Sequence, residues 1–348
     1  MRNYDYFIKG EENGMKDFKG KLAFITGGAS GAGFGQAQIF AEAGMKVVIA
    51  DVRQDHIDNA AAYFKGKDAQ VHFIKLDVMD RPGWTAAADE TERVFGTTPD
   101  LFIQTAGVNA FGPVEASTFE DYDWVVGVNF TGVANGLVTF VPRMIKAGKG
   151  GHITTTISLG AFMASPGVAP YTAAKAATLN LMESYYQALK PYGIEVSAFI
   201  PANIRSNIND GVLKTRPEHL KNTGYNVTEE TVEFMYANMQ AYGMDPRDLA
   251  VLLKKGIEDG VFLIVPYPSG AKVFERNLER FALYTTVEGM KELEDRLTRP
   301  PTEEQKKLTL ETEGYDRSEL KPTKSREEVG VAMARKDIDW VDEKKRVK

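Results

Sequence analysis

Cysteine is absent from this sequence of 348 residues, which excludes disulfide bonds, thiolate metal sites and cysteine nucleophiles. Histidine is scarce as well: only four are present, and no two of them have the i,i+4 spacing of a zinc-binding helix. We therefore expect no metal site, and metal-assisted catalysis is disfavoured.

An excess of basic charge is also missing. The formal net charge is −6, and no cluster of lysine and arginine is interleaved with aromatic residues in the body of the chain, which disfavours nucleic-acid binding. No stretch reaches about 18 apolar residues, and residues 1–14 lack the apolar segment of a signal peptide. We expect a cytoplasmic protein that acts on a small molecule and binds neither nucleic acid nor membrane.

Charged residues are concentrated near the C-terminus, where residues 291–348 hold 15 basic and 15 acidic side chains. This change in composition predicts an N-terminal extension over residues 1–17, a nucleotide-binding domain over 18–290 and a charged extension over 291–348. The charged extension is either a solvated tail or an arm that packs on a second subunit, because it contains apolar anchors such as Trp340.

Short apolar runs alternate with helical patterns between residues 20 and 270. Runs of this length and composition are typical of strands that are buried on both faces of a parallel sheet. The alternation predicts an α/β fold: a Rossmann-like, doubly wound parallel sheet of about seven strands with helices on both faces and the ligand site at the carboxyl ends of the strands. The expected strands are Leu22–Thr26, Val47–Ala50, Val71–Lys75, Leu101–Gln104, Ile153–Ile157, Glu195–Ile200 and Val261–Val265, and the expected helices are Gly33–Ala43, Glu120–Ile145, Tyr171–Leu189, Thr228–Tyr242 and Pro246–Glu258.

A glycine-rich turn, TGGASGAGFG, follows the first expected strand and leads directly into a helical pattern. Small residues let the backbone of such a turn approach a pyrophosphate, whose negative charge is favoured at a helix amino terminus. A flexible loop without a ligand is the alternative. We expect a dinucleotide cofactor to be bound by Gly27, Ser30, Gly31, Ala32 and Gly33.

The second expected strand leads to Asp51, whose carboxylate can accept hydrogen bonds from both hydroxyls of the adenosine ribose and would repel a 2′-phosphate. NAD is therefore favoured over NADP, although Arg53 could pair with a 2′-phosphate. Asp77 and Val78 follow the third strand and are expected to flank the adenine. The alternative role for Asp51 is a helix cap, and the alternative for Asp77 and Val78 is a plain turn between a strand and a helix.

A candidate proton-transfer pair lies on one expected helix. Tyr171 and Lys175 are four residues apart, so both side chains face the same way, and an ammonium close to a phenol lowers the pKa of the phenol. Ser158 follows the fifth strand, at the edge of the sheet where the cofactor is expected. Asn129 stands in the middle of a helical pattern, where asparagine is unfavourable without a special role. A tyrosine and a lysine exposed on a helix surface are the alternative.

In order and spacing, these motifs resemble the short-chain dehydrogenase/reductase family, in its compact form, over about residues 18–270. The resemblance implies that Tyr171 is the general acid/base, that Lys175 lowers its pKa and holds the nicotinamide ribose, that Ser158 orients the substrate oxygen and that Asn129 anchors a proton-relay water. The matching motifs are Thr26-Gly27-x-x-x-Gly31-x-Gly33, Asp51, Ala106-Gly107, Asn129, Ser158, Tyr171-x-x-x-Lys175 and Pro201.

The resemblance also implies further cofactor contacts at Ala106, Gly107, Pro201, Ile204 and Ser206. The sequence departs from the family pattern in three places, which read Gln104-Thr105-Ala106-Gly107, Pro201-Ala202 and Ser206. At a finer level, the segment Ala50–His56 and the run Ser206-Asn207-Ile208 look like a bacterial subgroup that includes the lignin β-aryl-ether Cα-dehydrogenases. Members of that subgroup oxidise a benzylic secondary alcohol with NAD.

The segments expected around the substrate are apolar and aromatic, which suits a hydrophobic aromatic alcohol or ketone. Residues 207–245 are expected to form a substrate lid. Arg205 could pair with an acidic substrate, and the apolar residues of 234–242 could instead be ordinary helix core. The substrate-site candidates are Phe111, Phe162, Met163, Val168, Asn203, Ile208, Phe234, Met235, Met239 and Tyr242.

The sequence thus predicts an NAD-dependent enzyme that transfers a hydride between nicotinamide and a secondary alcohol or ketone. The alternative is a regulatory or sensing protein that binds NAD without turnover. Two long expected helices carry apolar residues on more than one face, which predicts a homodimer or homotetramer. These residues are Val125, Val133, Leu137, Val141, Leu179, Leu181, Met182, Tyr185 and Leu189.

Overall fold

The computed structural model describes residues 14–221, 223–267 and 270–285. The chain divides into two units, Met1–Gly270 and Ala271–Lys348. This division falls before the boundary near residue 290 that charge composition predicts, because the fold of the first unit is complete once its last strand has joined the sheet. The expectations for residues 1–13 and 291–348, including the arm with Trp340, lie outside the described residues.

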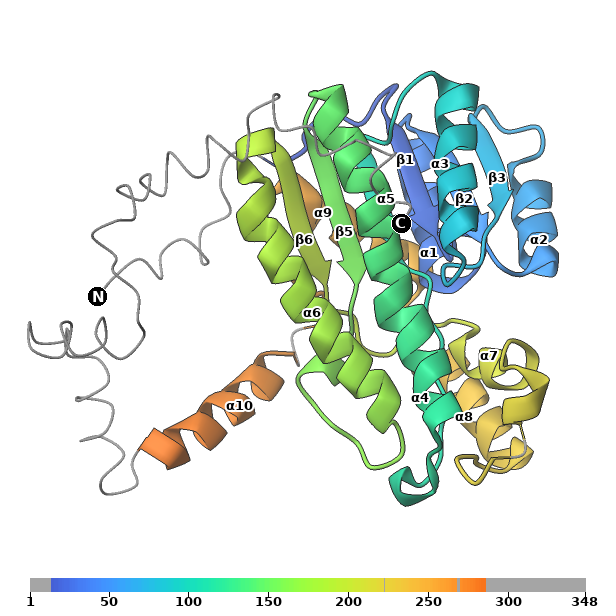
Figure 1. Ribbon diagram of the computed structural model, residues 1–348, viewed down its shortest axis with the longest axis vertical. Coiled ribbons are helices and arrows are strands. Elements are labelled where there is room, and N and C mark those ends of the chain that lie inside the picture. Colours follow the sequence, from blue (N-terminus) through green and yellow to red (C-terminus); the bar gives the residue numbers. More distant parts are fainter. Residues whose placement is uncertain (1–13, 222, 268–269, 286–348) are drawn as a thin grey trace, which may run out of the picture. The chain divides into compact units, whose positions relative to one another are not determined.

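A single parallel sheet forms the centre of the first unit (Figure 1). Its described strands have the order β3-β2-β1-β4-β5-β6-β7. The chain adds strands on one side of β1 up to β3 and on the other side from β4 onwards. A change of side of this kind creates a crevice for ligands at the carboxyl ends of the strands. The predicted doubly wound α/β fold is confirmed. The strands are β1 Leu22–Thr26, β2 Lys46–Asp51, β3 Val71–Lys75, β4 Leu101–Gln104, β5 Gly151–Thr156, β6 Ile194–Phe199 and β7 Leu263–Ile264.

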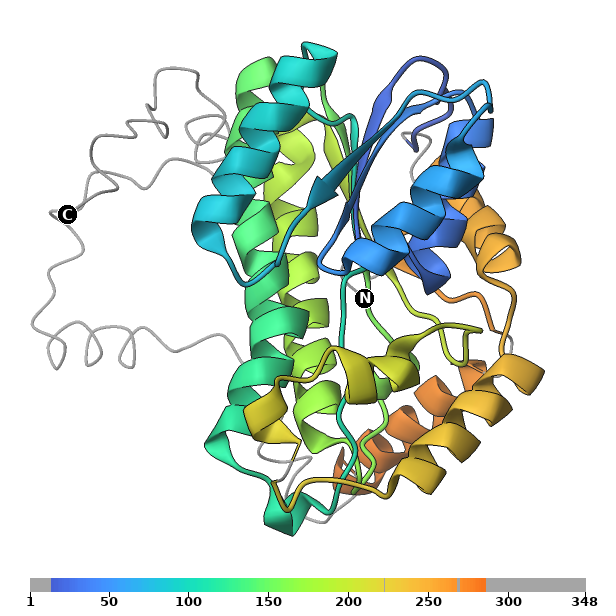
Figure 2. The same ribbon diagram turned by 90° about the vertical axis from the view of Figure 1, so that its right-hand side faces the viewer.

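Helices cover both faces of the sheet (Figures 1 and 2). On one face, Trp84 of α3, Phe140 of α5 and Met182 of α6 share a buried cluster with strand side chains. On the other face, Phe40 of α1 and Leu253 of α9 pack in a second cluster. The helices are α1 Gly31–Glu42, α2 Gln54–Phe64, α3 Arg81–Phe95, α4 Phe119–Val126, α5 Gly132–Ala147, α6 Ala169–Leu189, α7 Ile208–Lys214, α8 Glu229–Tyr242, α9 Pro246–Glu258 and, mainly in the second unit, α10 Gly270–Thr285, with short 3-10 helices at Val114–Ala116, Leu159–Ala161, Lys190–Tyr192 and Glu218–Leu220.

The expected elements differ from the observed ones mainly at their ends. Strand β7 has only two residues, with Leu263 40% exposed, because it lies at the edge of the sheet and pairs with β6 alone. Helices α2, α3, α7 and α10 are not among the expected helices. In α2, alanines and polar residues outnumber large apolar side chains, and its buried face consists of Ile57, Ala60 and Phe64, so few large residues mark it in the sequence.

One long helix is interrupted. The single helix expected at Glu120–Ile145 consists of α4, a π-helical segment at Gly127–Thr131 and α5. Within the described residues, the continuous stretch Phe119–Ala147 is the one that has the length and composition of a membrane span, and 61% of its apolar window is buried inside the protein. Core helices of an α/β protein meet the same criterion.

The insertion expected to be a lid forms α7 and α8, which lie beyond the carboxyl ends of the strands (Figure 2). Most of the apolar residues that the sequence predicted to form free faces on the long helices are covered within the chain. Their residues Val125, Val133, Leu137, Val141, Met182 and Leu189 are buried within the chain itself, and Leu179, Leu181 and Tyr185 are half-buried against the same cluster.

Candidate active site

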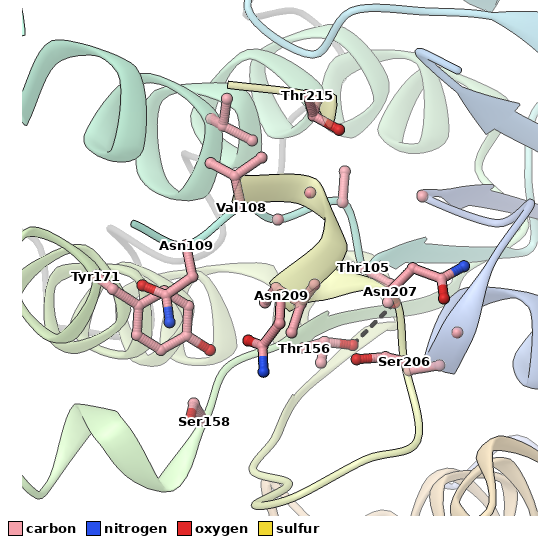
Figure 3. A pocket seen from close by; sticks show the side chains of 18 of the residues that line it. Thr105, Val108, Asn109, Thr156, Ser158, Tyr171, Ser206, Asn207, Asn209 and Thr215 are labelled. Atoms are coloured by element: carbon pink, nitrogen blue, oxygen red, sulfur yellow. Dashed lines mark hydrogen bonds between the residues drawn. The ribbon is translucent and has the colours of Figure 1, made fainter. Parts of the chain in front are cut away.

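A cavity of about 1050 Å³ opens at the carboxyl ends of the strands. It is lined by the turn after β1, by the ends of β2 and β3, by the loops after β4, β5 and β6, and by residues of α6, α7 and α8. Figure 3 shows side chains from several of these segments pointing into one space. A volume of this size exceeds the ordinary range for one drug-sized ligand, so it suits a large cofactor together with a substrate.

The glycine turn at one end of the cavity needs its glycines. Gly27 and Gly31 have φ of +62° and +50°, a region that side chains with a Cβ rarely occupy. A Cβ on Gly33 would lie 2.2 Å from the carbonyl oxygen of Gly27, so the third glycine lets α1 pack closely on the turn. Gly27, Ser30, Gly31 and Ala32 line the cavity as predicted, whereas Gly33 lies behind them.

Asp51 lies at the end of β2 and lines the same cavity. Its carboxylate accepts hydrogen bonds from the backbone N–H groups of Ala29, at 3.3 Å, and Arg53, at 3.0 Å. Burial raises the pKa of Asp51, and these backbone donors oppose that shift. The Arg53 guanidinium is paired with Asp55, through a hydrogen bond of 3.0 Å from Nε and a second one from Nη2. Asp77, which with Val78 lines the cavity beyond β3, accepts a hydrogen bond of 2.9 Å from the backbone of Met79.

Three of the four residues expected to carry the chemistry meet in the cavity. Ser158 is extended just after β5, and its hydroxyl accepts a hydrogen bond of 3.0 Å from the N–H of Gly160. Tyr171 projects from the first turn of α6 into the space that Ser158 faces (Figure 3). Lys175 is one helical turn further on, with its Nζ 5.6 Å from the centre of the Tyr171 ring.

The electrostatics differ from the expectation in one respect. Burial raises the pKa of Tyr171, and a hydrogen bond with Ser158 acts in the opposite direction. The Lys175 ammonium, expected to lower this pKa, donates a hydrogen bond to the carbonyl oxygen of Thr156 at 2.8 Å, and burial lowers its own pKa to about 8. The hydrogen bond with Ser158 is therefore the contact that favours the phenolate in this structure.

Asn129 lies in the π-helical segment, fully buried and behind the cavity wall. Its side chain bonds the backbone of Val108 on both sides, accepting from the N–H at 3.2 Å and donating to the carbonyl at 2.8 Å. Its own carbonyl accepts a bond of 3.0 Å from the Thr178 hydroxyl. Asn129 thus fixes the loop after β4, and its role towards a relay water stays a prediction.

The polar side chains that depart from the family pattern at Gln104 and Thr105 form hydrogen bonds within the protein. The Thr105 hydroxyl donates to Oε1 of Gln36 at 2.7 Å and is hydrogen-bonded to the Thr156 hydroxyl at 2.8 Å (Figure 3). Gln104 is buried and donates to the Thr155 hydroxyl at 3.3 Å. Ala106, Gly107, Pro201, Ile204 and Ser206 line the cavity, as the resemblance implies.

Most of the substrate-site candidates line the cavity, but three do not. Phe162 packs against the core cluster beneath it, whereas Phe234 and Tyr242 are 68% and 82% exposed on α8, because that helix turns them to the outside. Arg205, considered for an acidic substrate, is paired with Asp245 at 2.8 Å. The candidates that do line the cavity are Phe111, Met163, Val168, Asn203, Ile208, Met235 and Met239.

Sequence analysis missed two features of this region. Asn109 and Asn209 line the cavity, and both are more than nine-tenths buried. Asp121 and Arg216 form a buried ion pair that joins the start of α4 to the segment after α7. No local pattern distinguishes such residues, because each depends on contacts between distant parts of the chain.

The chain's own residues fit a nicotinamide dinucleotide. Gly31 leaves no room for a Cβ, which would lie 2.9 Å from the Cβ of Ser206, so the glycine turn and the loop after β6 form a narrow cradle. A buried carboxylate at the end of β2 suits the ribose hydroxyls of such a cofactor. A cradle of this kind, opening beside a serine, a tyrosine and a lysine, defines a Rossmann-fold oxidoreductase.

The chain belongs to the short-chain dehydrogenases: the family model described as short chain dehydrogenase matches residues 21–217. It is 51% identical over 265 residues to C alpha-dehydrogenase of Sphingobium sp. (strain NBRC 103272 / SYK-6), covering 76% of this chain and 86% of that protein. It is 34% identical over 194 residues to the NADP-dependent (R)-specific alcohol dehydrogenase of Lentilactobacillus kefiri, covering 55% and 76%. The crystal structure of a short chain dehydrogenase/reductase from Burkholderia phymatum in complex with NAD matches with a TM-score of 0.71 and 30% identity, covering 83% and 99%.

These findings confirm the predicted family, its resemblance to the Cα-dehydrogenase subgroup and the predicted class of enzyme. The protein is an oxidoreductase that uses a nicotinamide cofactor to interconvert a secondary alcohol and a ketone.

Proposed function

We propose that this enzyme uses NAD to oxidise hydrophobic aromatic secondary alcohols, above all benzylic ones, with Tyr171 as the acid/base. The observation that carries the proposal is the placement of Ser158 and Tyr171 in a cavity whose remaining wall is largely apolar. Phe111, Met163 and Met235 are among the side chains on that wall. An aromatic ring next to the carbinol would bury apolar surface there.

Proton transfer is assigned to the chain's own residues. The Ser158 hydroxyl donates a hydrogen bond to the substrate oxygen, and the Tyr171 phenolate takes the hydroxyl proton during oxidation. In the reverse direction the Tyr171 phenol returns this proton to the ketone oxygen. Lys175 is held by the Thr156 carbonyl close to the phenol ring, where its positive charge favours the phenolate. Nicotinamide, when bound, accepts the hydride of the alcohol or supplies it to the ketone.

Two features support NAD rather than NADP as the cofactor. The Asp51 carboxylate lines the expected ribose site, where a 2′-phosphate would meet a like charge. Arg53, the neighbouring cation that could offset this repulsion, is engaged by Asp55. The pKa of Asp55 is lowered to about 2 by its hydrogen bond with Arg53, so this pair is ionised at neutral pH.

We also propose that the enzyme works in the cytoplasm as a homodimer or homotetramer. Val138 of α5 is 54% exposed, and Leu179 and Tyr185 of α6 are half-buried, so these helices keep some apolar surface for a second copy. Light scattering coupled to size exclusion measures the oligomeric state directly, and a monomer at micromolar concentration would contradict the proposal.

The proposed activity is tested by following NADH absorbance with a panel of secondary alcohols in matched pairs. We expect kcat/KM for 1-phenylethanol to be at least about tenfold above that for 1-cyclohexylethanol. The two alcohols differ mainly in aromaticity, and the aromatic ring can pack against aromatic side chains of the wall such as Phe111. Equal rates would contradict the aromatic preference. Absence of turnover with every alcohol would contradict the assigned activity and leave the NAD-binding sensor as the function.

A further inference from the structure

Two loops meet beside the reactive end of the cavity: the loop after β4 and the loop that leads into α6. The first contributes Phe111 to the cavity wall, and Val168 at the end of the second also lines it. The backbones of the loops are joined by a hydrogen bond of 3.1 Å from the N–H of Gly112 to the carbonyl oxygen of Gly167. Tyr171 follows closely on α6. The spacing of these loops therefore helps to set the width of the cavity next to the reacting groups.

The side chain of Tyr225 bridges the same two loops. Tyr225 belongs to the segment between α7 and α8; it is 0% exposed, and it does not line the cavity. Its hydroxyl donates a hydrogen bond of 3.1 Å to the carbonyl oxygen of Gly167 and lies 3.4 Å from the carbonyl oxygen of Ala110. One phenolic O–H is thus shared between the loops, from a position outside the substrate space.

Tyr225 is itself held firmly. Its carbonyl oxygen accepts a hydrogen bond of 3.0 Å from Arg216, whose guanidinium is paired with the buried carboxylate of Asp121. A Cβ on Gly112 would lie 2.5 Å from the carbonyl carbon of Tyr225, so the first loop packs directly on the Tyr225 backbone. The ring belongs to a buried cluster that includes Val108 of the cavity wall. The hydroxyl is therefore presented to both loops in one orientation.

The Tyr225 hydroxyl remains a hydrogen-bond donor at neutral and mildly alkaline pH, because burial raises the pKa of Tyr225 to about 12. A buried carbonyl oxygen that loses its donor is unfavourable, and a loop can relieve this by moving. Ala110 is the direct neighbour of Phe111, and Gly167 is the direct neighbour of Val168. A movement of either carbonyl would consequently displace a side chain of the cavity wall.

We propose that Tyr225 is a positioning residue that determines substrate specificity: its hydroxyl holds the two loops at the spacing that lets an aromatic ring pack against Phe111 and Val168. Tyr225 contacts neither substrate nor cofactor, and it acts through the backbones of the loops. This inference rests on the proposed function, because it takes the apolar wall beside Ser158 and Tyr171 as the site of the aromatic ring.

The test uses Tyr225→Phe, which removes the hydroxyl and keeps the ring. We expect kcat/KM for 1-phenylethanol to fall at least about fivefold, mainly through KM, because the aromatic ring loses its fit to the wall. For 2-butanol, which has no ring to place there, kcat/KM should change by less than about twofold. The ratio of the two values is the readout, since a smaller amount of folded enzyme lowers both values equally. An unchanged ratio would overturn the proposal.

Two controls separate this role from other causes. Tyr63→Phe makes the same substitution on α2, outside the cavity, and it should leave the ratio unchanged. NAD affinity, measured by calorimetry, should change by less than about threefold in Tyr225→Phe, because the glycine turn is not part of the bridge. A fall in the ratio that Tyr63→Phe reproduced, or one that came with at least about tenfold weaker NAD binding, would contradict a specific role for Tyr225.

Hydrogen–deuterium exchange tests the bridge without any turnover. In Tyr225→Phe, peptides covering residues 108–113 and 165–169 should exchange at least about fivefold faster than in the native protein, and the peptide covering residues 27–33 should be unchanged. If the native protein oxidised neither alcohol, the proposed function would fail, but faster exchange confined to the two loops would still support the positioning role. Unchanged exchange in both loops would overturn that role even in an active enzyme.

Discussion

The carboxylate of Asp121 and the guanidinium of Arg216 form an ion pair that is shielded from water, with side chains 0% and 1% exposed. The two residues are 95 positions apart in the chain. Asp121 also accepts from the backbone N–H of Thr118 at 3.1 Å and so completes the capping box of α4. One carboxylate therefore links the start of a core helix to the segment after α7.

Removing this carboxylate is expected to destabilise the protein. Asp121→Asn leaves the Arg216 charge buried without a counter-ion, which typically costs about 3–5 kcal/mol in the free energy of unfolding. Urea denaturation followed by circular dichroism measures this loss. Asp123→Asn, an exposed change on the same helix, serves as the control and should change stability by less than about 0.5 kcal/mol. Similar losses in both variants would contradict the structural role of the pair.

Tyr171→Phe should abolish turnover and leave the cofactor in place. The phenol is assigned the proton transfer, so kcat should fall by at least about 100-fold. Cofactor affinity should change only a few-fold, because the glycine turn and Asp51 make separate contacts with the dinucleotide. Steady-state kinetics and calorimetric titration with NAD measure the two effects. A variant that kept more than about a tenth of the native kcat would disprove the assignment.

The pH dependence of alcohol oxidation should respond to Ser158. Oxidation needs the phenolate, so kcat/KM should rise with pH towards the pKa of Tyr171, which burial raises and the hydrogen bond with Ser158 lowers. Ser158→Ala removes the hydrogen bond that lowers the pKa of Tyr171, so the rising part of the kcat/KM profile should move to higher pH. The profile is recorded between about pH 6 and 10.5. A limb that stayed in place or moved to lower pH would show that Ser158 does not stabilise the phenolate.

Cofactor preference should depend on the charge of Asp51. The native enzyme should prefer NAD by at least about tenfold in kcat/KM, because a 2′-phosphate would be repelled by this carboxylate. Asp51→Asn keeps the size of the side chain and removes its charge, so it should reduce the difference in kcat/KM between NAD and NADP. Asp55→Asn takes away a partner of Arg53 and should narrow it by a separate route. Equal use of both cofactors by the native enzyme would contradict the preference.

Acid should weaken the fold through His152. Burial lowers the pKa of His152 to about 3, from an ordinary value of 6.5, while its Nε2 is bonded to the Ser197 hydroxyl at 2.9 Å. Between these two values the unfolded chain binds a proton that the folded chain does not, so stability falls as the pH drops below about 6.5. The loss at pH 5 relative to pH 7.5 should be about 2 kcal/mol from this residue.

His152→Gln should flatten this dependence, whatever its effect on stability at pH 7.5. Urea denaturation at the two pH values measures the difference for each variant. His72→Gln is the matched control, because it makes the same substitution at an imidazole that is only half-buried and pairs with Glu90 at 2.7 Å. An equal acid loss in the native protein and in His152→Gln would refute the assignment.

Local features of this protein were predictable from sequence, and distant pairings were not. The strands around the site, the glycine turn and the Tyr171–Lys175 spacing each depend on residues close together in the chain, so their patterns are visible in one sequence. Arg216 meets Asp121 only after the insertion has folded back over the sheet. Phe162 looked like a pocket residue by composition, but only packing decides that it faces the core.

The π-helical segment Gly127–Thr131 changes the phase of the helix that contains it. If a regular α-helix continued from Val125, the residues on its inward side would be about 132, 136, 139 and 143. The large side chains buried most deeply there are each one position later, namely Val133, Leu137, Phe140 and Met144, beside the buried glycines at 132 and 136. The segment thus absorbs one extra residue, and the same interrupted helix can turn Asp121 towards Arg216 and its apolar stripe towards the sheet. Deleting one residue from Gly127–Thr131 would rotate α4 against α5 by about 100°. Asp121 could then not face Arg216 while the apolar stripe of α5 faces the sheet.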